Sequence, residues 1–390
     1  MTSLSRIACT GLLACVSILF ALPGAAAQQA DASAGSSSPV AFVYVSHPSA
    51  DSGTAPDNIV AWSANAQGKL TPVSGSPFAG NVIPMAVNGK YLFAGSTDGS
   101  SIDTFLMSST GALKQIDTLN DQKYLSGTCD QVTHLVLDHT GATLYSYAAY
   151  SGIDCAADST WQSFKVDDTN GSLSYLGATA HSTSWYYPLR FIGDDVYAFE
   201  ASGTDIYGFR RESNGMLAYA TDTTYLPAGP SGETYNALYV AANPTNHLAV
   251  TLQPNGSGAT QLGTYTVNSS GHLSTNSTVN NMPKGSFGSP YYSQMSPSGK
   301  LLAVGGTSGL QVFHFNGGSP LTHYTGLLTT TPITQMYWDN DNHLYAISRG
   351  IDNKLYVFTV TATSCAQAPG SPYTISDPLA IIVQPKTAKP

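Results

Sequence analysis

The sequence predicts an all-β fold: a seven-bladed β-propeller of four-stranded antiparallel blades, with the ring closed by the C-terminal strand. Three observations predict it. A Gly-x-Leu element recurs at intervals of 43 to 60 residues, seven pairs of inner strands fit between these elements, and the two ends of the chain supply complementary strands. Repetition of four short strands at such a period is typical of propellers.

The Gly-x-Leu element marks one turn of each repeat. It occurs at Gly68–Leu70, Gly111–Leu113, Gly171–Leu173, Gly215–Leu217 and Gly271–Leu273, with a distorted copy at Gly318–Leu321. Each copy follows a strand of alternating residues, such as Gln261–Thr266. A glycine in that place predicts a hairpin turn that needs a positive φ, and the leucine predicts the start of the next strand.

The remaining strands fall between these turns, and we name the four strands of a unit a to d from the channel outward. Strand a is expected near Ile83, His134, Leu189, Leu238, Tyr292, Met336 and Ala380, and strand b near Val43, Leu92, Leu144, Tyr197, Leu248, Leu302 and Tyr345. The chain therefore begins on a strand b and ends on a strand a, Pro378–Val383. Together these two strands complete one blade, which removes an exposed sheet edge.

The first residues have the pattern of an export signal. Arg6 precedes an apolar run from Ile7 to Phe20, and Ala25–Ala27 supplies the small residues of a cleavage site. We therefore predict a signal peptide over 1–27, a flexible linker over 28–38 and the propeller over 39–390, in a secreted or periplasmic protein. The alternative is a lipoprotein in which Cys15 is acylated.

Composition restricts the partners and cofactors. Only 10% of the residues are charged and the formal net charge is −9, which argues against nucleic acid as a partner. After the leader, no stretch approaches the roughly 18 apolar residues of a membrane helix. Cys129 and Cys155 are expected to form a disulfide, which an export route permits, and Cys365 is left over. No cysteine has metal-ligand spacing, and we expect neither a metal nor a cofactor.

Several segments of the chain resemble the sequences of one protein family. Ser296–Val304 (SPSGKLLAV), Leu344–Val360 (LYAISRGIDNKLYVFTV) and Asn170–Leu176 (NGSLSYL) are similar to the lactonase-type seven-bladed propellers, which include bacterial 6-phosphogluconolactonase and fungal carboxy-muconate lactonising enzyme. Gly75–Phe78 (GSPF) and Gly370–Tyr373 (GSPY) resemble exported bacterial members. The resemblance covers essentially the whole mature chain and implies the fold. It implies the activity far less specifically, because propellers host many functions.

The resemblance also implies a pair of catalytic residues. Family enzymes use a histidine, a glutamate and arginines around one mouth of the channel to open or close a lactone. His134, in strand a of the third unit, matches the histidine, and Glu200, ending strand b of the fourth, matches the glutamate. Because strand a begins at the face where strand b ends, both are expected at one mouth. His134 would activate water, and Glu200 would orient it or protonate the leaving oxygen.

The arginines depart from the family pattern. Arg190 lies one residue later than the family arginine of the fourth unit, so we expect its side chain to point to the opposite face. The arginine of the fifth unit is absent, since Leu252–Pro254 stands there, while Arg349 faces the same mouth from the seventh unit. The displaced arginines and the export signal both count against a phosphorylated lactone as substrate.

Each candidate also has a structural alternative. His134 can be a hydrogen-bonded core histidine, Glu200 a solubilising charge at a loop edge, and Arg190 the partner of a nearby Asp. Tyr291 and Tyr292, which open a strand, resemble a sugar-stacking platform, but we expect them to pack between blades.

Two functions remain open at this point, and with them the question of whether the protein is an enzyme. One is a lactonase-like hydrolase that acts on an unphosphorylated, extracytoplasmic sugar lactone with His134 and Glu200 as its acid–base pair. The other is a non-catalytic propeller that binds a glycan or a protein at the same mouth. The family resemblance favours the first function, and the missing arginines favour the second.

Overall fold

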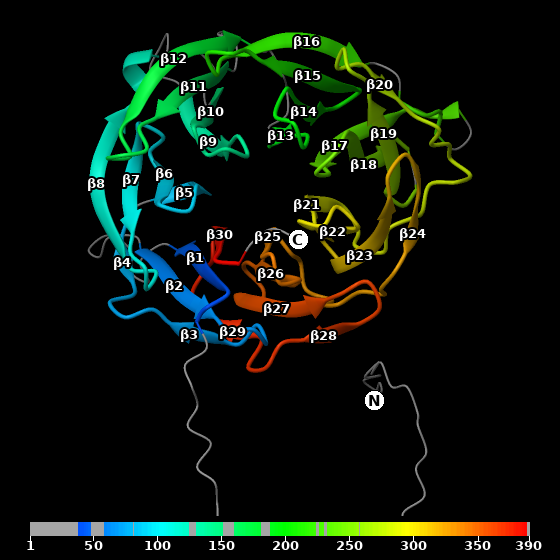
Figure 1. Cartoon of the computed structure of the whole chain (residues 1–390). Helices are drawn as coiled ribbons and strands as arrows, with labels where there is room; N and C mark the ends of the chain where they lie inside the picture. The colour runs from blue at the N-terminus through cyan, green and yellow to red at the C-terminus, as the bar shows by residue number, and fades with distance from the viewer. Residues whose placement is uncertain are drawn as a thin grey trace, which may run out of the picture. The chain divides into compact units, whose positions relative to one another are not determined.

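A computed structural model describes residues 38–47, 58–80, 82–124, 130–150, 160–180, 188–223, 226–229, 232–256 and 258–387. These residues form seven small antiparallel sheets arranged as blades around a ring (Figure 1). The predicted signal peptide, most of the linker, Cys129 and Cys155 lie outside the described residues. Among the helices of the described part, none is long and apolar enough to cross a membrane.

The blades follow one another along the chain, and their strands have the following bounds. Blade 1 holds β1 (Ala41–His47), β2 (Asn58–Ala64), β3 (Leu70–Pro72), β4 (Phe78–Ala79) and β30 (Ala380–Pro385). Blade 2 holds β5 (Val82–Val87), β6 (Tyr91–Ser96), β7 (Ser101–Met107) and β8 (Leu113–Asn120), and is followed by a 3-10 turn, η1 (Gln122–Tyr124). Blade 3 holds β9 (Asp130–Leu137), β10 (Thr143–Tyr150), β11 (Thr160–Val166) and β12 (Leu173–Ala180).

The second half of the ring repeats the arrangement. Blade 4 holds β13 (Arg190–Phe191), β14 (Tyr197–Ser202), β15 (Asp205–Arg211) and β16 (Leu217–Thr223). Blade 5 holds β17 (Tyr235–Ala242), β18 (His247–Pro254), β19 (Gln261–Val267) and β20 (Leu273–Ser274). Blade 6 holds β21 (Pro290–Met295), β22 (Leu301–Gly306), β23 (Gly309–Asn316) and β24 (Ser319–His323). Blade 7 holds β25 (Gln335–Trp338), β26 (His343–Ser348), β27 (Lys354–Val360), β28 (Cys365–Gln367) and β29 (Tyr373–Thr374).

The ring closes as the sequence predicts. β30, from the C-terminal end of the chain, pairs antiparallel with β1, so that Ala380 lies opposite Ser46 and Pro385 opposite Ala41. Blade 1 thus takes its inner strand from one end of the chain and its outer strands from the other (Figure 1). This closure pairs the inner edge of β1, which would otherwise be exposed.

The Gly-x-Leu turns join each blade to the one before it. Strands β3, β8, β12, β16 and β20 all begin at the predicted leucines. Gly111 has a φ of 86°, and a Cβ at this position would come within 2.5 Å of the Phe42 ring of blade 1. The hydroxyl of Tyr44, also in blade 1, donates to the carbonyl of Gly111 at 2.9 Å. The glycine is therefore required by the backbone conformation and by close packing between the blades.

The core lies between the blades. Buried apolar side chains of the described residues form seven clusters, and each cluster fills the interface of two neighbouring blades. Tyr145 and Trp161 of blade 3, for example, pack with Leu189, Phe191 and Phe209 of blade 4. Because both faces of each sheet are covered in this way, polar side chains that point away from these interfaces gather at the central channel and at the two rims.

Candidate functional site

The inner strands of all seven blades line a central channel. Its wider part is a cavity of about 500 Å³, to which the ends of the strands a and the turns that follow them contribute. Its rim includes Asn88, His139, Asn243, Pro297, Asn340 and Pro385. We call this end the turn mouth. It lies opposite the end where strand a begins, so the larger cavity is not at the mouth where the sequence predicts the site.

A second, smaller cavity of about 80 Å³ lies further toward the beginning of the strands a. We call it the histidine cavity, because His134 lines it together with Arg190, Tyr292, Gln335 and Tyr337. Leu135, Arg190 and Tyr337 line both cavities. The two cavities are therefore neighbouring parts of one channel that share these side chains.

His134 reaches the channel because β9 is irregular at this point. The register with β10 shifts between Tyr147 and Ala148, which leaves Thr133 as a bulge residue beside His134. The imidazole Nδ1 lies 3.1 Å from the hydroxyl of Thr133. Burial and, to a lesser extent, the positive charge of Arg190 lower the pKa of His134 to about 4. The ring is therefore neutral near pH 7 and can accept a proton.

Arg190 also points into the channel, and this differs from the expectation that its displacement would turn it away. Leu189 and Phe191, on either side of it, pack into the interface with blade 3, which leaves Arg190 to face the centre. Its guanidinium donates to the hydroxyl of Tyr292 at 2.8 Å and lies 5.3 Å from the centre of that ring. Among the described residues no carboxylate pairs with it, so an Asp partner is not found.

The charge of Arg190 is retained despite its position. Burial opposes the charge, but the nearby hydroxyls of Tyr292 and Tyr337 outweigh this effect and raise the pKa of Arg190. Burial raises the pKa of Tyr337, and the neighbouring Tyr292 raises it further. The Tyr337 hydroxyl therefore keeps its proton and can donate a hydrogen bond. A cation and two phenolic hydroxyls therefore lie together beside the neutral ring of His134.

Glu200 is placed between blades 3 and 4, away from a direct contact with His134. Its carboxylate is almost fully buried and accepts a 2.8 Å hydrogen bond from the indole Nε1 of Trp161. Two aromatic rings connect Glu200 to His134, because Trp161 packs on Tyr147 and Tyr147 packs edge-on to His134. Glu200 is therefore not a charge at the rim, and among the described residues no hydrogen bond joins it to His134.

Arg349 lies just after β26 and is not among the residues that line either cavity. It forms a bidentate ion pair with Asp377, in which Nε lies 2.8 Å from Oδ1 and Nη2 lies 3.2 Å from Oδ2. Both side chains are more than a third exposed. Of the four predicted site residues, the structure thus brings His134 and Arg190 together and places Glu200 and Arg349 elsewhere. Their catalytic roles stay predictions.

Tyr337, Gln335 and Gln294 line the channel although the sequence did not single them out, and Tyr292 was expected only to pack between blades. All four lie on β21 or β25, which were correctly predicted as inner strands. Tyr292 does pack in the interface of blades 6 and 7, but its hydroxyl also reaches Arg190. The missed signal was positional: polar residues on predicted strands a are candidates for the channel lining.

No protein-family model and no curated protein matches the sequence. Solved structures do match. A proposed 6-phosphogluconolactonase from Bacteroides uniformis has a TM-score of 0.66 at 15% identity, over 89% of this chain and 100% of the other. A periplasmic gluconolactonase from Pseudomonas aeruginosa has a TM-score of 0.50 at 14% identity, over 88% and 85%. Sqt1 from Chaetomium thermophilum, solved with the N-terminus of a ribosomal protein, has a TM-score of 0.51 at 16% identity, over 83% and 82%.

These comparisons define the class of protein. The chain is a seven-bladed β-propeller, and at these identities the likeness concerns the fold. Proteins described as lactonases are among its structural neighbours, which confirms the resemblance to lactonase-type propellers at this level. The activity has to be argued from the channel itself.

Proposed function

We propose that this protein hydrolyses an unphosphorylated lactone in the channel, where the histidine cavity joins the wider cavity. The observation that carries the proposal is that a neutral imidazole, His134, and a guanidinium, Arg190, line one cavity. Among the described residues, no carboxylate pairs with this guanidinium. A base and a fixed positive donor are the two groups that ester-bond hydrolysis needs.

The chemistry follows from these groups. His134 takes a proton from water as the water oxygen bonds to the lactone carbonyl carbon. Arg190, with the hydroxyl of Tyr337, stabilises the negative charge that develops on the carbonyl oxygen. When this intermediate collapses, the bond from the carbonyl carbon to the ring oxygen breaks. The ring oxygen takes the proton back from His134, and the product is a hydroxy acid.

The charges around the channel support an unphosphorylated substrate. Of the described residues that line the two cavities, Arg190 is the one arginine, and none is a lysine. A phosphate would therefore find a single permanent cation, which the lactone carbonyl also requires in this mechanism. The predicted signal peptide supports export, and export would separate the protein from cytosolic phosphorylated lactones.

The experiment is a pH-stat assay of residues 28–390 on a panel of unphosphorylated sugar lactones. We expect turnover above the buffer rate, with a loss of at least 100-fold in His134→Gln and in Arg190→Met. Arg349→Gln is the matched control, because its ion pair with Asp377 lies outside the cavity lining, and it should retain activity. Rates equal to buffer for every lactone, in folded protein, would overturn the proposal in favour of a non-catalytic propeller that binds a glycan or protein.

A further inference from the structure

We propose that the cavity at the turn mouth is a binding site for a hydroxylated carboxylate, such as a sugar acid, with the carboxylate held by Arg190. The proposal goes beyond the hydrolysis proposed above and does not require it. It depends on the wide cavity, on the uncompensated charge of Arg190 and on the unused amide of Gln294.

The charge of Arg190 favours an anionic ligand. Arg190 lies at the inner end of the cavity, and its described polar partners are the Tyr292 hydroxyl at 2.8 Å and the Leu189 carbonyl at 3.5 Å. Both are neutral. A guanidinium offers five N–H donors, and charged groups inside proteins are normally paired. A carboxylate that enters the cavity would supply the missing negative charge and accept two of the free donors side by side.

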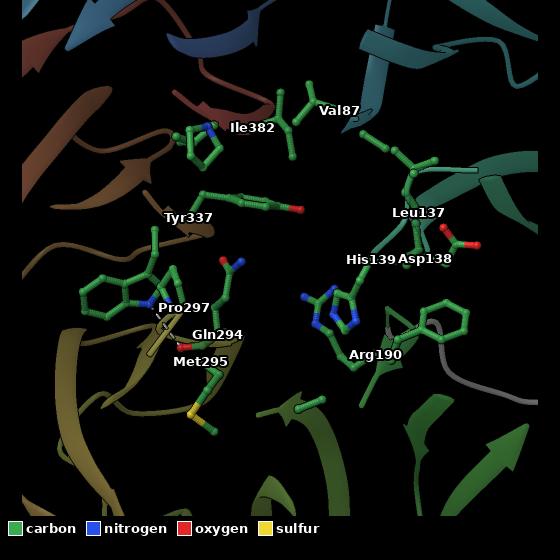
Figure 2. A pocket seen from close by; sticks show the side chains of 18 of the residues that line it. Val87, Leu137, Asp138, His139, Arg190, Gln294, Met295, Pro297, Tyr337 and Ile382 are labelled. Carbon is green, nitrogen blue, oxygen red and sulfur yellow. Dashed lines mark hydrogen bonds between the residues drawn. The ribbon is translucent and has the colours of Figure 1, made fainter. Parts of the chain in front are cut away.

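Among the described residues, none forms a hydrogen bond with the side-chain amide of Gln294. Gln294 of β21 uses its backbone carbonyl to accept from the indole of Trp338, but its side-chain Oε1 is buried without a partner. Figure 2 shows the side chains of Gln294, Tyr337 and Arg190 directed toward the middle of the cavity. Buried polar atoms are nearly always hydrogen-bonded, so this amide calls for a ligand that can both donate and accept. A hydroxyl group does both.

The other charged groups around the cavity are already paired. Asp138 is fully buried and forms an ion pair with the Arg211 guanidinium, whose Nη2 lies 2.8 Å from Oδ2, and His139 Nδ1 lies 2.8 Å from Asp195 Oδ1. These pairs leave Arg190 as the dominant charge for an incoming ligand.

The rim of the cavity carries three amide side chains, those of Asn88, Asn243 and Asn340. Asn88 is held in place by a bond between turns of neighbouring blades, because its side-chain amide donates to the carbonyl of Gly141 at 3.2 Å. A volume of about 500 Å³ lies within the range of small-molecule sites and far exceeds the needs of a simple anion. The lining therefore fits a molecule with one carboxylate and a hydroxyl-rich body.

The test is isothermal titration calorimetry of residues 28–390 at pH 7 with gluconate as the probe. Glucitol, which has the same carbon chain without the carboxylate, and acetate, which has the carboxylate without the hydroxyls, are the comparison ligands. We expect gluconate to bind at least tenfold more tightly than either. Arg190→Met should abolish binding, and Gln294→Leu should weaken it at least fivefold. The exposed Arg210→Met is the matched control and should bind normally.

The outcomes separate this proposal from the hydrolase. His134→Gln should retain gluconate binding within twofold even if it loses all turnover, and wild-type binding without turnover would overturn the hydrolase alone. No gluconate binding by folded wild type, or equal affinity for acetate, would overturn the site. If Arg190→Met does not fold, Arg190→Lys keeps the charge but loses the planar fork, and it should still weaken binding. Unchanged affinity in both Arg190→Lys and Gln294→Leu would also overturn the site.

Discussion

Arg190 of β13 donates a 2.8 Å hydrogen bond to the hydroxyl of Tyr292 on β21, and so joins blades 4 and 6 across the channel. Blade 5 lies between these blades in the ring (Figure 1). Because the partner is a neutral hydroxyl, the bond fixes the position of the guanidinium without cancelling its charge. This is the relationship on which both proposals rest.

The low pKa of His134 predicts that the free energy of unfolding decreases at acidic pH. A pKa of about 4 in the folded state, against 6.5 for an ordinary histidine, means that the unfolded chain binds the proton more tightly. The contribution is therefore complete above pH 6.5 and is lost as the pH falls toward 4, with a magnitude on the order of 3 kcal/mol. Urea unfolding at pH 7 and pH 4.5 should show a smaller loss for His134→Gln than for wild type. The exposed His272→Gln is the control and should behave as wild type; equal losses in all three proteins would contradict the prediction.

Two adjacent arginines should differ sharply in their effect on stability. Arg211 pairs at 2.8 Å with Asp138, whose side chain is fully buried, while Arg210 is largely exposed and lies 3.9 Å from Glu212. Arg211→Met leaves a buried carboxylate without its cation and should cost about 3 kcal/mol, whereas Arg210→Met should cost less than about 0.5 kcal/mol. Chemical unfolding of both variants measures the difference. Similar costs for the two would show that the Asp138 pair does not stabilise the fold.

The contact between Trp161 and Glu200 should be structural. Trp161→Phe removes the hydrogen bond to the buried carboxylate and should lower the free energy of unfolding by about 2 kcal/mol. Glu200→Gln keeps an acceptor for the indole, so we expect a smaller loss of stability and lactone turnover within tenfold of wild type. Thermal unfolding and the pH-stat assay report the two effects separately. A 100-fold loss of turnover in stable Glu200→Gln would instead assign Glu200 the acid–base role that the family resemblance implies.

The closing strand should be essential to the ring. Deletion of residues 378–390 removes β30, exposes the inner edge of β1 and takes Ile381 and Ile382 out of two blade interfaces. We expect aggregation or loss of a single cooperative thermal transition. The exposed Lys386→Ala leaves the strand intact and should change stability by less than about 1 kcal/mol. A deletion variant that stays monomeric and unfolds like wild type would contradict a closing role for β30.

The sequence by itself determined the blade count, the inner strands, the leucines that begin the outer strands and the closure of the ring. These features are local: a turn glycine, an alternating strand and a re-entering leucine lie within a few residues of each other in every repeat. The site is different, because Arg190, Gln294 and Tyr337 come from three blades and meet only across the channel. The packing of Leu189 and Phe191 against blade 3 decides the direction of the Arg190 side chain. Glu200 accepts a hydrogen bond from Trp161 in the interface of blades 3 and 4. Only the tertiary structure decides such contacts, because they depend on which side chains the neighbouring blades present.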